Sequence, residues 1–426
     1  TFSVCAAASL LAGILPALHR SRQADTLIST ARSSASRALL LFQRGLMVAQ
    51  IALGVGLLAA AGLLTHSLLH SSSVNPGFRV DNAIAFETGF PSAGWRESIA
   101  VSQRILDATR STPGVVSAGW ITNPPPETRA GVFLPFWIVG ANTTPQPFCN
   151  FQVSSEDYFS TAGVAFSRGR DFTLADASTS PPVAIVNETL ARQFFRDQDP
   201  IGKHISTPMQ GNKTAVEIVG VIRDIHDRGL GAKATATVYV PFRQFALAYG
   251  GVVARLSAPP DVVIPELRRR VAQADPTIPL RAVSSIQTRL RATLDTPRFY
   301  TVMAVACAFM AILFVTLGLY GVISYAVSRR TSEVGIRMAL GASRENILRG
   351  VIRQGLAIAS LGLVFGLALA LASTRLLRTL LFEIKPVDPA TLSLAAALVV
   401  LVTLAASYFP ARRASRVEPM TALRHE

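Results

Sequence analysis

One run of residues has the side-chain types of a metal site, Arg223-Asp224-Ile225-His226-Asp227. A histidine nitrogen beside two carboxylates is a familiar set of metal ligands. The run holds a single histidine, however, in a polar turn after a predicted strand, where such a residue is more often solvated. We therefore predict no metal site. We also find no nucleophile with a base and an orienting acid at plausible positions, so we predict that the chain is not an enzyme.

Nucleotide chemistry finds no support in the sequence either. A phosphate-binding loop needs Gly, four residues and then Gly-Lys-Ser/Thr, whereas the Gly202-Lys203 pair is followed by His204. We predict no cofactor in this chain. The adjacent acids Glu156 and Asp157 are not expected to work together, because neighbouring side chains in a strand diverge.

Several glycines lie in apolar runs, where small residues let helix backbones approach closely. Gly54-Val55-Gly56 resembles part of a dinucleotide-binding fingerprint, but its apolar surroundings favour helix packing. We predict this transmembrane packing role for Gly54, Gly56, Gly362 and Gly366, and expect Gly318 and Gly321 to act likewise.

Long apolar runs must position these glycines. Half of the residues are hydrophobic and 16% are charged, which suits a membrane protein with a sizeable aqueous part. We predict an α-helical transmembrane bundle with a large inserted α/β extracytoplasmic domain, residues 70–298. The runs long enough to cross a bilayer are 46–69, 299–327, 354–374 and 389–410.

Arginines fix the predicted orientation. The link 19–45 holds five Arg against one Asp, the segment 328–353 holds six Arg against two Glu, and the tail 411–426 holds four Arg against two Glu. Basic residues near span ends stay on the cytoplasmic side, so these segments are predicted to be inside and the domain outside. The net charge of +15 therefore suits anionic lipid headgroups better than nucleic acid.

The apolar run 1–18 has its basic residues after it, which is not the order in a signal peptide. We predict that it is the last transmembrane helix of a preceding unit, and that an upstream portion is missing. The segment Pro16 to Arg22 echoes Pro410 to Arg416, with Pro, Ala, Ser and Arg at matching places. This echo favours a duplicated unit, although two ordinary helix ends would also explain it.

The extracytoplasmic domain alternates strand-like and helical patterns. Asn187 is predicted to cap the helix that begins at Glu188, and we place inner boundaries near Pro145 and Ala258. Cys149 is the domain's only cysteine, which excludes a disulfide within it. The predicted strands are 83–87, 115–122, 183–186, 215–222, 236–240 and 252–256, and the predicted helices are 96–110, 188–196 and 262–274.

The short segment between the second and third spans, SRRTSEVGIRMALGASRENILRGVIR, has an apolar side and a charged side. Its core, EVGIRMALGA at 333–342, resembles the cytoplasmic signature of MacB/FtsX-type ABC transporter permeases. The ending PARRASRVEPMTALR at 410–424 resembles the C-terminus of the same family. The resemblance covers the chain from Leu46 onward.

This resemblance implies a multi-pass bacterial inner-membrane permease whose ATP is bound by a separate cytoplasmic ABC ATPase. It implies that motion passes through the spans to drive export, that a periplasmic or outer-membrane partner takes part, and that a homologous unit lies in the same polypeptide. An FtsX-like regulator of a cell-wall hydrolase is the alternative, and a membrane sensor is a more distant one. The implied ATPase-docking helix contains Glu333, Gly335, Ile336, Arg337, Leu340 and Gly341, which could otherwise lie among lipid headgroups.

Overall fold

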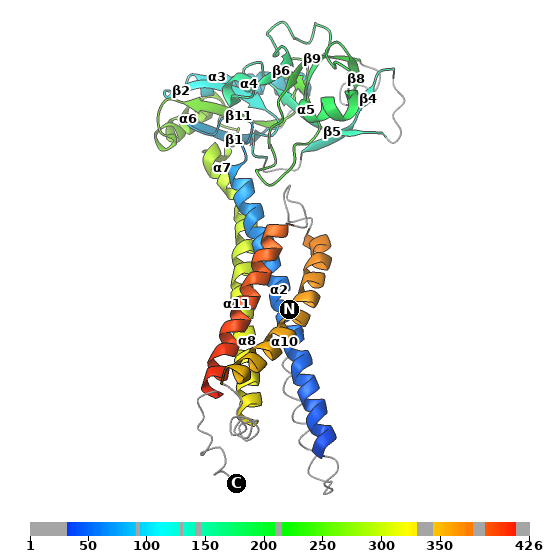
Figure 1. The fold of residues 1–426 in the computed structure, drawn as a ribbon. Helices are drawn as coiled ribbons and strands as arrows, with labels where there is room; N and C mark the ends of the chain where they lie inside the picture. Colours follow the sequence, from blue (N-terminus) through cyan, green and yellow to red (C-terminus); the bar gives the residue numbers. More distant parts are fainter. Residues whose placement is uncertain are drawn as a thin grey trace, which may run out of the picture. The chain divides into compact units, whose positions relative to one another are not determined.

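The computed structural model describes residues 32–90, 94–127, 131–140, 146–196, 198–208, 215–329, 344–377 and 388–414. These residues belong to two compact units. The helical unit takes its described residues from Thr1–Leu58, Ala308–Leu371 and Leu392–Glu426. The domain unit takes them from Ala59–Cys307 and Ala372–Thr391, and it holds all the strands of Figure 1.

Four long helices carry the apolar runs: α2 (Arg32–Ser73), α8 (Asp295–Arg329), α10 (Arg344–Leu377) and α11 (Pro389–Ala414). Within the described residues each is long and apolar enough to cross a membrane, in agreement with the four predicted spans. Helix α2 starts earlier than its span, so part of the predicted link 19–45 is helical. The predicted remnant helix at 1–18 lies outside the described residues.

The domain is built on one mixed sheet. Its strands are β1 (Ala83–Gly89), β2 (Val115–Ile121), β3 (Val132–Pro135), β4 (Trp137–Ile138), β5 (Phe148–Ser154), β6 (Phe166–Gly169), β7 (Val183–Asn187), β8 (His204–Ser206), β9 (Val216–Ile222), β10 (Thr237–Pro241), β11 (Tyr249–Leu256) and β12 (Arg281–Ser285). Their order is β12-β1-β11-β2-β5-β10-β7-β9-β8-β4, with β3 on β5 and β6 on β9. The pairs β5–β10 and β7–β9 are parallel, and the other pairs are antiparallel.

Alternation along the strands gives the domain two cores, because successive side chains point to opposite faces of a sheet. On β1, Ile84 and Phe86 belong to one core, together with α3 (Trp95–Arg110) and α6 (Pro260–Ala274). The neighbouring residues Ala83 and Ala85 belong to the other, together with α4 (Tyr158–Ala162) and α7 (Ile286–Ala292). Helices therefore cover both faces of this part of the sheet.

The six predicted strands are confirmed as β1, β2, β7, β9, β10 and β11, and the predicted helices as α3, α6 and the pair α5 (Glu188–Leu190) and η1 (Ala191–Phe195). Asn187 caps α5 as predicted, since its Oδ1 accepts a hydrogen bond from the Leu190 N–H at 3.1 Å. The shorter elements β3, β4, β6, β8, α4 and α7 were not predicted, nor were β5 and β12.

The inner boundaries near Pro145 and Ala258 are wrong. Strand β3 pairs with β5, so the second half of the sheet already begins before Pro145. Strand β11 pairs with β1 and β2, so the chain has returned to the first half by Tyr249. The prolines around 145 mark a turn inside one half, and pairing partners distant in sequence decide the boundary.

Candidate functional site

The implied ATPase-docking residues, 333 to 341, lie outside the described residues. The structure describes the helices on either side, α8 to Arg329 and α10 from Arg344. At the start of α10 the exposed Arg349 Nη2 lies 3.1 Å from Glu345 Oε1. An acid in the first helical turn is favourable because it faces the positive end of the helix dipole.

The predicted packing glycines of α10 lie against α2. A Cβ built on Gly362 would lie 2.6 Å from the Cβ of Ile51, and one built on Gly366 would lie 2.6 Å from the Cβ of Val55. Real side chains do not approach so closely. Any larger residue at either position would therefore push the two helices apart.

The other glycines of the helical unit differ among themselves. A Cβ on Gly54 would lie 3.3 Å from Val315 of α8, and one on Gly56 would lie 3.3 Å from Leu369 of α10. A Cβ on Gly318 would lie 2.7 Å from Gln50 Oε1. A Cβ on Gly321 would meet open space, so the expected packing role of that residue is not seen.

In the domain unit, α2 and α8 both reach the core that contains α4 and α7. Leu68, in the last turns of α2, packs against this core, and Leu290 of α7 and Leu294 just before α8 are part of it. The Thr301 Oγ1 of α8 lies 3.5 Å from the Leu64 carbonyl oxygen of α2. The ends of both membrane helices are therefore anchored beneath the same face of the sheet.

A buried ion pair reinforces this anchor. Arg289 of α7 donates from Nη2 to Oε1 of Glu87 on β1 at 2.5 Å, and their side chains are only 4% and 9% exposed. Two charges this deeply buried are tolerated when they face each other with good geometry. The pair fixes α7, and with it the start of α8, to β1.

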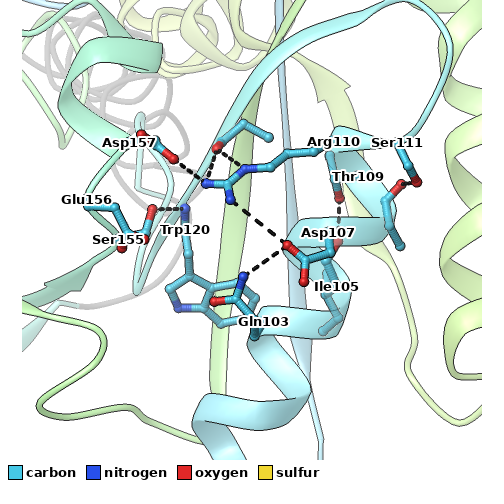
Figure 2. Close-up of polar contacts among 12 residues, drawn as sticks. Gln103, Ile105, Asp107, Thr109, Arg110, Ser111, Trp120, Ser155, Glu156 and Asp157 are labelled. Carbon is cyan, nitrogen blue, oxygen red and sulfur yellow. Dashed lines mark hydrogen bonds and ion pairs between the residues drawn. The ribbon is translucent and has the colours of Figure 1, made fainter. Parts of the chain in front are cut away.

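Figure 2 shows a second polar network, at the end of α3. The Arg110 guanidinium donates to the Ala118 carbonyl oxygen of β2 at 3.2 Å and to Asp157 Oδ2 at 2.5 Å. Glu156, the neighbour of Asp157, instead accepts from Arg243 at 3.2 Å. The two adjacent acids therefore contact different arginines, although they lie in the turn after β5 and not in a strand, as the prediction had assumed. The network joins α3 to β2 and α4.

The run 223–227 does not form a metal site by itself. Asp224 accepts hydrogen bonds from Asn187 and Thr189, at 2.8 Å each, while His226 Nδ1 lies 2.8 Å from the Ala232 carbonyl oxygen. Asp227 is buried elsewhere. Among the described residues no group of three or more His, Cys, Asp or Glu side chains is placed to hold a metal ion.

Asp227 joins a group that the sequence did not indicate, which we name the carboxylate cluster: Glu127, Asn150, Gln152 and Asp227. Asn150 Nδ2 lies 3.2 Å from Glu127 Oε1 and 3.4 Å from Asp227 Oδ2, and Gln152 Nε2 donates to Glu127 Oε1 at 2.5 Å. Burial, with the neighbouring Asp227 charge, raises the pKa of Glu127 to about 7. Burial raises the pKa of Asp227 to about 6. The cluster thus holds two carboxyl groups in surroundings that disfavour their charge.

Known proteins and solved structures resemble this chain. It is 28% identical over 287 residues to a macrolide export ATP-binding/permease protein MacB of Bradyrhizobium diazoefficiens, a match covering 63% of this chain and 42% of that protein. A MacB of Azoarcus is 27% identical over 61% of this chain and 40% of that protein. The chain thus matches well under half the length of these relatives. The periplasmic region of MacB from Actinobacillus actinomycetemcomitans matches 51% of this chain, with a TM-score of 0.36 and 14% identity.

Two family models divide the chain between them. The MacB-like periplasmic core domain matches residues 45–274, which is more than half of the 426 residues. The FtsX-like permease C-terminal model matches residues 305–419. Together they cover the first described membrane helix from Gly45, most of the sheet domain, and the helices that follow it. The chain is therefore a member of the MacB/FtsX-type ABC transporter permeases, multi-pass proteins of the inner membrane.

Proposed function

We propose that this chain is a permease subunit that conveys the motion of a separate cytoplasmic ATPase to its periplasmic domain, and that this motion extrudes a substrate. The observation that carries the proposal is the anchoring of α2 and α8 in one core of the domain. Each is a single uninterrupted helix, over Arg32–Ser73 and Asp295–Arg329. A packed core moves as a unit and does not deform gradually, so a shift of these helix ends would shift the sheet above them.

The segment between α8 and α10 would receive the motion. Its implied docking residues offer what such a contact needs: apolar Ile336 and Leu340 to bury, the charges of Glu333 and Arg337 to set the register, and glycine where backbones approach closely. The ATP-binding partner is itself part of the proposal.

Transport is favoured over regulation by the names of the relatives. The matched proteins of Bradyrhizobium and Azoarcus are described as macrolide export proteins. We therefore propose a lipophilic substrate of that kind, handled at the outer face of the membrane. No described feature of this chain favours a cell-wall hydrolase partner over a substrate.

A disulfide between α2 and α8 tests the mechanical step. Leu64→Cys with Thr301→Cys, in a chain that also carries Cys5→Ser and Cys307→Ser, would link the two helices where they meet in the domain unit. Cys149 needs no replacement, because it is fully buried. Oxidation is expected to stop ATP-driven export of a macrolide from vesicles that contain the chain and a partner ABC ATPase that co-purifies with it. Reduction is expected to restore it.

The control is each single cysteine variant, which oxidation should not affect. Export that continues unchanged with the disulfide formed would contradict the proposal. ATPase co-purification measures docking separately: Arg337→Glu should abolish it and leave membrane insertion intact, whereas Glu345→Gln, just beyond the docking residues, should leave both intact.

A further inference from the structure

The carboxylate cluster contains three buried oxygens that accept no hydrogen bond from any described residue. These are Glu127 Oε2, Asp227 Oδ1 and Asn150 Oδ1. Asn150 is fully buried and Asp227 is 5% exposed, so bulk water does not satisfy them. Buried polar atoms almost always have a partner, and three acceptors without one in a single cluster require an explanation.

Two of these oxygens face the same small space beside Gly131. A Cβ built on Gly131 would lie 2.6 Å from Asn150 Oδ1 and 3.3 Å from Glu127 Oε2. The Glu127 N–H also donates to the Asp227 carbonyl oxygen at 2.5 Å, which brings the two acidic residues onto adjacent backbone segments. Because residue 131 is a glycine, no side chain fills the space beside these two oxygens.

The charge of the cluster is not balanced by a described ion pair. Among the described residues, the Arg228 charge lowers the pKa of both carboxyl groups, but Arg228 is exposed, and its guanidinium lies over the Phe133 ring, 5.8 Å from the ring centre. The side-chain donors that reach the carboxylates, Asn150 Nδ2 and Gln152 Nε2, are neutral amides, and the Asp227 carboxylate also accepts from the backbone N–H groups of Asp227 and Arg228. They occupy one oxygen of each carboxylate and leave the other oxygen of each free for a cation.

We propose that the carboxylate cluster binds a hard divalent cation, Mg²⁺ or Ca²⁺, through Glu127 Oε2, Asp227 Oδ1 and Asn150 Oδ1. All three ligands are oxygens, two of them from carboxylates, and these are the ligands that both ions prefer. Water completes the coordination from the side where Glu127 is partly exposed. The absence of sulfur and imidazole ligands selects against zinc.

The cation would join three segments that are far apart in the sequence. Glu127 follows β2, Asn150 lies on β5, and Asp227 lies in the connection from β9 to β10. None of these residues belongs to the helix anchors at α7 and α8. The site is therefore independent of the proposed transport mechanism, and its test does not depend on an ATPase or a substrate.

Calorimetric titration of the full-length chain in detergent tests the proposal. After removal of metals with EDTA, MgCl₂ and CaCl₂ are added in separate experiments. One saturable binding event per chain is expected for at least one of the ions. Glu127→Gln removes a charged ligand, and Gly131→Ala places a methyl group against Asn150 Oδ1. Each is expected to weaken binding at least tenfold.

Gly231→Ala is the matched control, because a Cβ there meets open space. It should bind as the unchanged chain does. The melting temperature of each metal-free variant, followed by tryptophan fluorescence, shows whether it is folded. Binding of equal strength in all four proteins would place the cation elsewhere and overturn the proposal. So would the absence of binding in the folded, unchanged chain, since the cluster would then hold a proton or water instead.

Discussion

The periplasmic domain buries two acidic centres in opposite ways. Near the membrane helices, Glu87 faces the guanidinium of Arg289 at 2.5 Å. Elsewhere in the domain, Glu127 and Asp227 share one neutral amide donor, Asn150 Nδ2. The first centre pairs two opposite charges within the chain, whereas the second leaves carboxylate oxygens without a donor among the described residues.

This difference assigns a structural role to the Glu87 centre and a binding role to the Glu127 centre. A buried carboxylate costs free energy unless an opposite charge or several donors compensate it. At Glu87 the chain supplies that compensation itself, so the pair fixes a helix to a strand. At Glu127 the described side chains supply neutral amide donors, and the cation proposed above would supply the opposite charge. The same physical rule therefore predicts mutational effects of opposite sign at the two centres.

The largest effect is expected for Arg289→Met, which leaves the carboxylate of Glu87 buried without its opposite charge. We expect a loss of about 3–5 kcal/mol in the free energy of unfolding. Tryptophan fluorescence during urea denaturation of the full-length chain measures it, because all three tryptophans, Trp95, Trp120 and Trp137, belong to the domain.

The double variant Glu87→Gln with Arg289→Met is the control for that prediction. It removes both charges, so much of the lost stability should return. A loss below about 1 kcal/mol for Arg289→Met alone would mean that the pair contributes no more than an exposed salt bridge. It would then no longer distinguish the two centres.

At the carboxylate cluster the sign reverses. With EDTA present, Glu127→Gln combined with Asp227→Asn should increase the free energy of unfolding by about 1–2 kcal/mol, because two like charges no longer share a buried site. Mg²⁺ or Ca²⁺ at a free concentration of a hundred times its dissociation constant should raise the free energy of unfolding of the unchanged chain by about 2.7 kcal/mol. Under that condition the unchanged chain should be more stable than the double variant. Destabilisation by the double variant under both conditions would show that the cluster is compensated within the chain.

A third carboxylate, Asp171, lies between these extremes. Burial, opposed by a hydrogen bond from the Phe172 N–H and reinforced by Asp157 and Glu156, raises the pKa of Asp171 to about 7. The unfolded chain has the ordinary pKa of 3.8. The folded state therefore binds the proton more tightly, and the stability that Asp171 contributes is present below pH 4 and lost as the pH rises to about 7.

The substitution Asp171→Asn should remove the loss of stability that occurs as the pH rises to about 7. Because the group is partly exposed, we expect the variant to be more stable than the unchanged chain by about 1 kcal/mol at pH 8. The two proteins should differ in the opposite direction, or not at all, at pH 4. Urea denaturation at both pH values measures the difference, and parallel pH dependences would contradict the assigned pKa.

Patterns local in the sequence predicted much of the fold. The four apolar runs predicted the four candidate membrane helices, and the strand-like pattern at 83–87 predicted β1. The cap at Asn187 followed from residue type and position alone. These features depend on neighbours within a few residues, and a single sequence contains that information.

The carboxylate cluster could not be predicted in the same way. Asp227 invited comparison with Asp224 and His226, its neighbours in sequence, yet its partners are Glu127 and Asn150. They meet because β5 pairs in parallel with β10, and parallel pairing joins segments far apart in the chain. Glu127 itself follows three prolines, a context that indicates a turn and says nothing of burial.

The smallest effect is expected at the network of Figure 2, where the charges are paired but exposed. Asp157 is 52% exposed beside Arg110, so Asp157→Asn should cost less than about 1 kcal/mol. Arg110 keeps its bond to the Ala118 carbonyl oxygen in this variant.

Because the Asp157 charge helps to raise the pKa of Asp171, the same variant should also move the pH dependence of stability that comes from Asp171 toward lower pH. A change in pH dependence with almost no change in stability at pH 4 would show that, at an exposed site, a charge matters more for its neighbour's proton than for the fold. Strong destabilisation at every pH would instead place Asp157 with Arg289 among the residues that hold the domain together.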